Sequence, residues 1–183
     1  NNLTGSIPGE LGELGELVSL ILSDNQLSGS IPKEIGKLSK LQYISFYNNN
    51  ITGEIPVEFF NLTELTDIGI QYMPLTGSLP SEIGNLKNLK RLCITNTNIS
   101  GNIPEEIGNL TNLECLCLRD NLFTGSIPNS LGNLVNLTEL DLRSNYLTGK
   151  VPASVMALPV WDRWWALIIL QSGDGDGVDS DGL

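Results

Sequence analysis

The stretch that decides the fold runs from Gly101 to Thr124 and reads GNIPEEIGNLTNLECLCLRDNLFT. Its first four residues form an anchor of the type Gly-x-(Ile/Leu/Val)-Pro, which a Ser or Thr precedes, and this anchor recurs every 24 residues. The anchor glycines are Gly5, Gly29, Gly53, Gly77, Gly101, Gly125 and Gly149. Equal spacings without one insertion indicate a stack of repeated units.

Three apolar columns recur between successive anchors. The first holds Leu17, Leu41, Leu65, Leu89, Leu113 and Leu137. The second holds Leu20, Ile44, Ile68, Leu92, Leu116 and Leu140, and the third holds Leu22, Phe46, Ile70, Ile94, Leu118 and Leu142. Because the second and third columns are two residues apart, their side chains lie on one face of a short strand.

One such unit cannot bury its leucines alone, whereas a stack of units buries them against each other. The pattern therefore predicts an α/β solenoid, with short parallel strands forming a sheet on the concave face and short helical or 3-10 segments on the convex face. An Asn follows the third column in most repeats, and we expect its side chain to bond backbone groups of neighbouring coils. Met73 and Thr97 replace this Asn in the third and fourth coils, where we expect local widening or a shifted loop.

The repeat consensus Leu-x-x-Leu-x-x-Leu-x-Leu-x-x-Asn-x-Leu-(Ser/Thr)-Gly-x-Ile-Pro resembles the plant-type leucine-rich repeat over residues 1 to about 158. In plant receptor kinases and cell-wall polygalacturonase inhibitors, this repeat builds a right-handed superhelix with a second small sheet. The resemblance implies a non-enzymatic module that recognises a protein or peptide through its concave face. It also implies an extracellular or cell-surface location.

The repeat register divides the chain into three segments. Residues 1–158 form the solenoid of about six full repeats, residues 159–172 a Trp-rich C-terminal cap, and residues 173–183 an acidic Gly/Asp tail. An alternative is that Trp161, Trp164 and Trp165 anchor a partner. The tail is interpreted as flexible, with a Ca²⁺ site as the alternative.

Composition narrows the classes of function. The chain of 183 residues carries 21 acidic and 10 basic side chains, so its net charge of −11 argues against nucleic acid as a partner. With no His, a Ser-His-Asp triad and a His-ligated metal site are excluded. We expect no enzymatic activity and no cofactor. Cys93, Cys115 and Cys117 share the outward face of the strands. No fourth ligand is evident beside them, so we expect no metal site. The sequence leaves two alternatives for Cys93 and Cys117, free thiols or a disulfide bond between them.

The outward strand positions are the expected binding surface, because the inward ones are occupied by packing. Tyrosines gather in the second and third coils, where they offer contact area at low entropic cost, and arginines gather in the last three coils, where they suit an anionic group. The alternative is that neighbouring acids neutralise these arginines. The predicted ligand-binding residues are Tyr43, Tyr47, Asp67, Gln71, Tyr72, Arg91, Arg119, Asp141 and Arg143.

Two further expectations concern modification and assembly. Asn-x-(Ser/Thr) sequons predict glycosylation in a secreted protein, although the repeat consensus itself generates such triplets. They begin at Asn2, Asn50, Asn61, Asn98, Asn109 and Asn136. Because the first coil begins in mid-repeat and leaves an apolar end open, the alternative function is an accessory structural subunit. It would pack into a larger assembly through that coil and the Trp-rich end.

Overall fold

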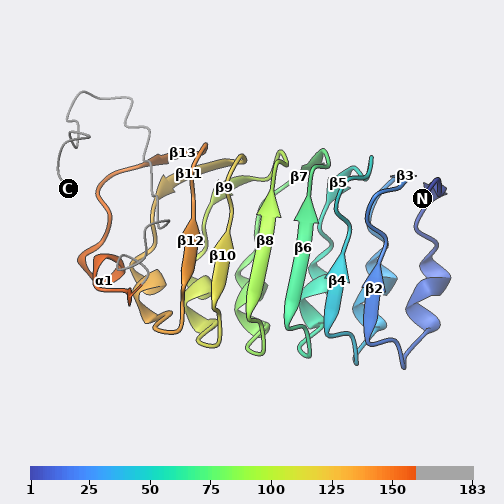
Figure 1. Cartoon of the computed structure of the whole chain (residues 1–183), viewed down its shortest axis with the longest axis horizontal. Coiled ribbons are helices and arrows are strands. Elements are labelled where there is room, and N and C mark those ends of the chain that lie inside the picture. Colours follow the sequence, from blue (N-terminus) through green and yellow to red (C-terminus); the bar gives the residue numbers. More distant parts are fainter. Residues whose placement is uncertain (160–183) are drawn as a thin grey trace.

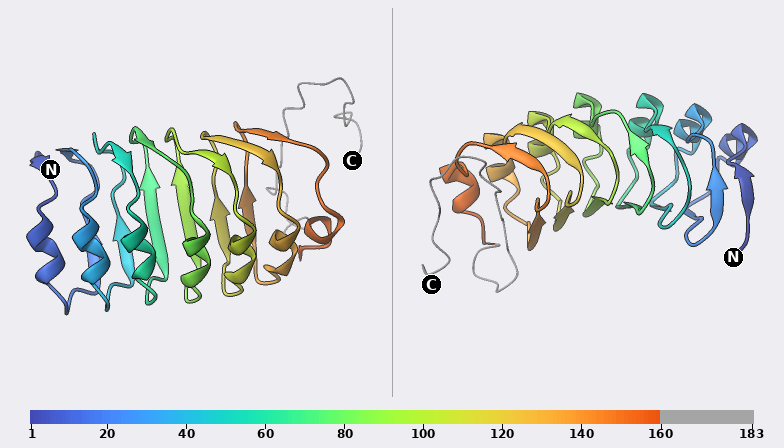
Figure 2. Two further views of the ribbon diagram at one scale, coloured as in Figure 1. Left: turned by 180° about the vertical axis from the view of Figure 1, so that it is seen from behind. Right: turned by 90° about the horizontal axis from the view of Figure 1, so that it is seen from above.

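The coils stack side by side along the length of the molecule (Figure 1), and seen from above they follow an arc (Figure 2, right). The computed structural model describes residues 1–159. Six parallel strands form the main sheet in the order β12-β10-β8-β6-β4-β2, so each strand pairs with the strand one coil away. The strands are β2 (Ser19–Ile21), β4 (Tyr43–Ser45), β6 (Asp67–Gln71), β8 (Arg91–Thr95), β10 (Cys115–Cys117) and β12 (Glu139–Asp141).

The 24-residue period becomes the register of this sheet. Leu92 pairs with Ile68 on one side and with Leu116 on the other, and each of the three side chains is at most 2% exposed. The strands thus form over the second apolar column, as the sequence predicts. The first and third columns pack into the same continuous core.

Short 3-10 helices cover the opposite side of the arc (Figure 2), which is its convex side. Each begins directly after an anchor proline, whose fixed φ suits the extended residue before a helix. They are η1 (Gly9–Glu13), η2 (Lys33–Lys37), η3 (Val57–Asn61), η4 (Ser81–Asn85), η5 (Glu105–Asn109) and η6 (Asn129–Asn133). The short helix α1 (Ala153–Met156) continues this row, and the prediction of helical or 3-10 segments there is confirmed.

Most of these helices carry a glycine that faces the next coil. A Cβ atom on Gly36 would lie only 2.3 Å from the backbone oxygen of Glu58, so the close approach of neighbouring helices requires glycine. Phe60 occupies the equivalent position in η3. Its ring is buried and packs edge-on against that of Phe59, with 5.6 Å between the ring centroids.

A second set of short parallel strands follows the main sheet, as the resemblance implies. The strands form three small sheets, β1-β3, β5-β7 and β13-β11-β9. They are β1 (Thr4–Ser6), β3 (Gln26–Ser28), β5 (Gly53–Glu54), β7 (Leu75–Thr76), β9 (Ser100–Asn102), β11 (Leu122–Ser126) and β13 (Tyr146–Thr148). The anchor glycines lie in or beside them with φ between 74° and 84°, values that glycine adopts readily.

The recurring asparagines connect the coils as expected. The side chain of Asn49 accepts a hydrogen bond from the Leu27 N–H at 3.0 Å and donates to the carbonyls of Leu22 and Phe46, both at 3.0 Å. The expected widening or shifted loop at Met73 and Thr97 is not found in the main sheet. Strands β6 and β8 instead lengthen to five residues and pair in register from Asp67–Arg91 to Gln71–Thr95.

The described part of the chain ends within the C-terminal turn after α1. No helix in residues 1–159 is long and apolar enough to cross a membrane. The expectations for Trp161, Trp164 and Trp165, and for the acidic tail with its Ca²⁺ alternative, fall outside the described residues.

Candidate ligand-binding face

The concave face of the main sheet displays the predicted binding residues on a regular grid. Residues two apart on one strand point to the same side, and in-register residues of neighbouring strands lie beside each other. Tyr43 therefore lies beside Asp67, and Asp67 beside Arg91. The structure brings the predicted tyrosines and Arg91 together in the first four coils and places Arg119 and Arg143 farther along the arc.

A hollow with a volume of about 270 Å³ opens in this face above Gly69. Gly69 contributes no side chain to the outward row that also holds Ser45 and Cys93, so the sheet surface is lower at this point. The walls come from residues of four neighbouring strands and their loops. They are Ser23, Tyr43, Ser45, Tyr47, Asp67, Ile68, Gln71, Arg91 and Cys93.

Aromatic rings border the hollow on one side. Tyr43, Tyr47 and Tyr72 are 40%, 37% and 45% exposed, so each ring presents apolar area to solvent. The rings of Tyr47 and Tyr72 contact each other edge-on. A rigid aromatic border beside a concave surface is suited to contact with a ligand side chain.

The arginines differ in how strongly their acidic neighbours engage them. Arg143 donates two hydrogen bonds to Asp141, at 2.8 Å from Nε and 2.6 Å from Nη2. Burial by itself would raise the pKa of Asp141, but these bonds from Arg143 outweigh it and lower that pKa. Arg119 contacts Asp141 at 3.9 Å and Arg91 contacts Asp67 at 3.6 Å, both longer than a hydrogen bond. Arg91, whose side chain is 61% exposed, therefore offers the most accessible guanidinium of the three.

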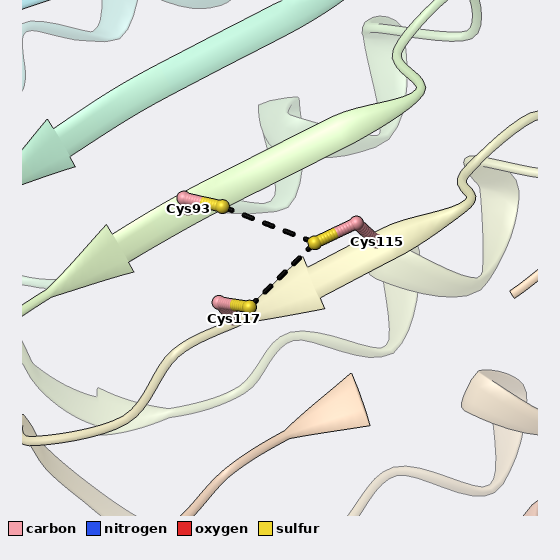
Figure 3. A group of neighbouring side chains, drawn as sticks. All are labelled: Cys93, Cys115 and Cys117. Carbon is pink, nitrogen blue, oxygen red and sulfur yellow. Dashed lines mark hydrogen bonds between the residues drawn. The ribbon is translucent and has the colours of Figure 1, made fainter. Parts of the chain in front are cut away.

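The sulfur atoms of the three cysteines converge between β8 and β10 (Figure 3). All three are free thiols and lie within 4.8 Å of one another. Sequence analysis missed their acidic neighbour, Glu139, which lies one coil beyond Cys115 in register. Its two carboxylate oxygens lie 3.2 Å from the sulfur of Cys115 and 3.4 Å from that of Cys117.

These thiols differ in acidity. The hydrogen bond with Cys115, together with the nearness of Cys117, holds the pKa of Cys93 well below the usual range of a thiol. For Cys117 the hydrogen bond with Cys115, the nearness of Cys93 and burial all raise the pKa.

The sequon asparagines all lie on the surface of the described residues. Each is exposed, so each is accessible to a glycosylating enzyme, while the modification itself stays a prediction. They are Asn2, Asn50, Asn61, Asn98, Asn109 and Asn136.

Comparison with protein families identifies the repeat. A family model described as a leucine-rich repeat region matches residues 68–158, and the leucine-rich repeat model matches residues 16–38 and 40–62. No curated protein sequence matches the chain significantly.

Several solved structures are similar to this chain. One is the ectodomain of the plant membrane receptor kinase GASSHO1/SCHENGEN3 from Arabidopsis thaliana in complex with CASPARIAN STRIP INTEGRITY FACTOR 2. It has a TM-score of 0.86 and 41% identity, with coverage of 87% of this chain and 19% of that chain. Another is the plant peptide hormone receptor RGFR1 in complex with RGF2. It has a TM-score of 0.83 and 40% identity, with coverage of 85% of this chain and 25% of that chain.

The ectodomain of the receptor kinase SOBIR1 from Arabidopsis thaliana is similar over most of its length. Its TM-score is 0.67 and its identity 31%, with coverage of 71% of this chain and 72% of that chain. By contrast, the chain spans only 19% and 25% of the first two receptor ectodomains. Since the repeat models match both halves of the solenoid and the plant receptor ectodomains above are similar in sequence and fold, the chain belongs to the plant-type leucine-rich repeat family.

Proposed function

We propose that this chain is a non-enzymatic recognition module that binds an extended peptide, or an extended segment of a protein, along its concave face. The observation that carries the proposal is the hollow above Gly69, bordered by Tyr43 and Tyr47 on the face where the side chains of the main sheet meet solvent. A ligand side chain would enter this hollow and anchor the segment.

The chemistry of the border defines the ligand. The tyrosine rings favour an aromatic or aliphatic anchor side chain, because burial of apolar area supplies most of the binding free energy at such sites. Asp67 and Gln71 offer hydrogen-bonding groups for the ligand backbone. Arg91 lies on the far side of the hollow and has no hydrogen bond to Asp67, so it would receive a carboxylate or sulfate of the ligand.

The relatives support a peptide ligand and an extracellular location. The GASSHO1/SCHENGEN3 and RGFR1 ectodomains were solved with CASPARIAN STRIP INTEGRITY FACTOR 2 and RGF2, and RGFR1 is named a peptide hormone receptor. In this proposal the chain lies outside the cell or at its surface, where the exposed sequons would carry glycan. Its charge of −11 disfavours nucleic acid as a ligand.

Panning a displayed library of random peptides against the full chain tests this function. The substitution Gly69→Leu fills the hollow, and Gly69 does not have the positive φ that would strain a larger residue. Ser19→Leu is the matched control, because it adds the same side chain to an exposed position on β2 that does not line the hollow. We expect enriched peptides to lose at least about tenfold in affinity with Gly69→Leu and with Tyr47→Ala, and to keep their affinity with Ser19→Leu.

Two results would overturn the proposal. One is a set of enriched peptides that bind the Gly69→Leu variant as tightly as the wild type. The other is a library in which the wild type enriches nothing above the Gly69→Leu background. A ligand mapped to the convex helices would favour the alternative of an accessory subunit in a larger assembly.

A further inference from the structure

The three cysteines and Glu139 occupy adjoining positions of the concave grid. Cys93 pairs in register with Cys117, and Cys115 pairs in register with Glu139. Cys115 and Cys117 are two residues apart on β10, so both side chains point to the same side of the sheet. Three neighbouring coils therefore contribute to one cluster, which contains every cysteine of the 183-residue chain.

We propose that Cys93, Cys115, Cys117 and Glu139 form a binding site for one thiophilic divalent metal ion of the Zn²⁺ class. This site adjoins the hollow, because Cys93 also lines its wall. Three sulfur ligands and one carboxylate oxygen complete a four-coordinate shell with no open position. Such a shell is typical of a structural metal site.

Distances between the donor atoms fit this coordination. With Zn–S bonds of about 2.3 Å, two sulfurs of a tetrahedral site lie about 3.8 Å apart, and a sulfur and a carboxylate oxygen lie about 3.5 Å apart. The sulfur of Cys115 lies 3.9 Å from that of Cys93 and 3.6 Å from that of Cys117. The oxygens of Glu139 lie 3.2 and 3.4 Å from the sulfurs of Cys115 and Cys117. The three sulfurs are therefore nearly in place before a metal enters. Glu139 lies near two of them, and its carboxylate turns toward Cys93 to complete the shell.

The surroundings suit a soft cation. Cys115 is buried, whereas Cys93 and Cys117 are partly exposed, so an ion can enter from the concave side and still lose most of its water. Arg91 lies beside Cys115 in register and offsets part of the negative charge that three thiolates and a carboxylate bring together. Thiolate ligands select Zn²⁺ and similar soft ions over Ca²⁺ and Mg²⁺, which prefer oxygen.

Titration of the reduced, metal-free full chain with Co²⁺ tests the site, with a phosphine reductant present to keep the thiols free. We expect a sulfur-to-cobalt charge-transfer band and visible bands of tetrahedral Co²⁺ that saturate at one ion per chain. Zn²⁺ should abolish these bands, and excess Ca²⁺ should leave them unchanged. Since the ion joins β8, β10 and β12, Zn²⁺ should also raise the Tm of the wild type.

Variants assign the ligands. Cys115→Ser should abolish the charge-transfer band and the rise in Tm, and so should Cys117→Ser. The Cys117→Ser variant provides the test if Cys115→Ser fails to fold, since Cys115 is buried and Cys117 is partly exposed. Glu139→Gln should weaken Co²⁺ binding at least about tenfold and shift the visible bands. Glu64→Gln, which alters a distant exposed carboxylate, is the matched control and should change neither.

Several outcomes would contradict the site. A wild-type chain without the charge-transfer band has no thiolate site for this ion. Saturation at one ion per two chains would place the metal between molecules. Equal affinity in the wild type and the Glu139→Gln variant would remove Glu139 from the shell and overturn the proposed ligand set.

Discussion

The ring of Tyr47 meets the ring of Tyr72 edge-on across two neighbouring coils, with 5.4 Å between the ring centroids and 80° between the planes. Tyr72 holds this contact with a φ of 55°, a left-handed value that is strained for a bulky residue. The equivalent positions of the other coils have the same φ but carry smaller polar residues, Asp24, Asn48, Asn96, Asp120 and Ser144. The exposed aromatic pair is thus present despite a backbone cost.

Replacing Tyr72 by Asn separates that cost from the contact. The substitution relieves about 1 kcal/mol of backbone strain and removes a ring pair worth about 0.5–1.5 kcal/mol. We expect the free energy of unfolding, measured by urea denaturation, to change by less than about 1 kcal/mol, while affinity for concave-face peptides falls. A loss of stability above about 2 kcal/mol would show that the ring serves folding instead.

Truncation of a buried leucine in a central strand should lower the free energy of unfolding strongly. Leu116 is fully buried between coils, so Leu116→Ala should lower the free energy of unfolding by about 2–5 kcal/mol. Ile21→Ala alters a strand residue that is 63% exposed and should change it by no more than about 0.5 kcal/mol. Denaturant unfolding of the two variants measures the difference, and equal losses would contradict the assignment of inward and outward positions.

The asparagine bonds between coils provide a third test. Asn121 donates from its side chain to the carbonyls of Ile94 at 2.8 Å and Leu118 at 2.9 Å, both in the buried interior. Asn121→Ala should therefore destabilise the chain by about 2–3 kcal/mol. Asn25 makes similar bonds but is only partly buried, so Asn25→Ala should cost about 1 kcal/mol. We expect the Asn121→Ala variant to melt at a lower temperature than the Asn25→Ala variant. The reverse order of melting temperatures would refute the prediction.

The interaction of Glu105 with Ser130 predicts a pH dependence. Hydrogen bonds from the side chain of Ser130, and then from its backbone N–H, lower the pKa of Glu105; the N–H lies 3.1 Å from Oε2. A group whose pKa is lowered on folding stabilises the fold above its unfolded pKa, and this contribution is lost as the pH falls through the folded pKa. Melting curves of the wild type and Glu105→Gln should therefore differ at pH 7 and converge as the pH falls below the lowered pKa of Glu105. If the difference in melting temperature between the two proteins stays constant over this pH range, the Glu105 carboxylate is excluded as its cause.

The constant spacing of the repeats was sufficient to predict the main sheet. A spacing of 24 residues places Leu92 beside Leu116 whatever the other residues are, because neighbouring coils of equal length stack in register. The prediction failed at Met73, since it assigned the regularity of the coil to the Asn side chain. In the structure, five residues of β6 pair with five of β8 at that joint, and backbone bonds maintain the register.

The site was harder to predict because it depends on combinations of neighbours. Gly69 is one outward residue among many in the sequence, and it marks a hollow only because Tyr43 and Tyr47 stand beside it. Glu139 could have been found, since it follows Cys115 by one period of 24 residues. Its carboxylate was missed because ligand motifs are usually sought at short spacings along the chain.

Phe60 gives one joint of the arch a different shape. Glycine at the equivalent position of other coils keeps the outer circumference short, whereas the Phe60 ring lengthens it between the third and fourth coils. On the inner circumference, the five-residue pairing of β6 with β8 holds the same two coils together. Since the difference between the two circumferences sets the curvature of an arch, bending should concentrate at this joint. The tyrosine-bearing half and the cysteine-bearing half would then tilt toward each other about the base of the hollow.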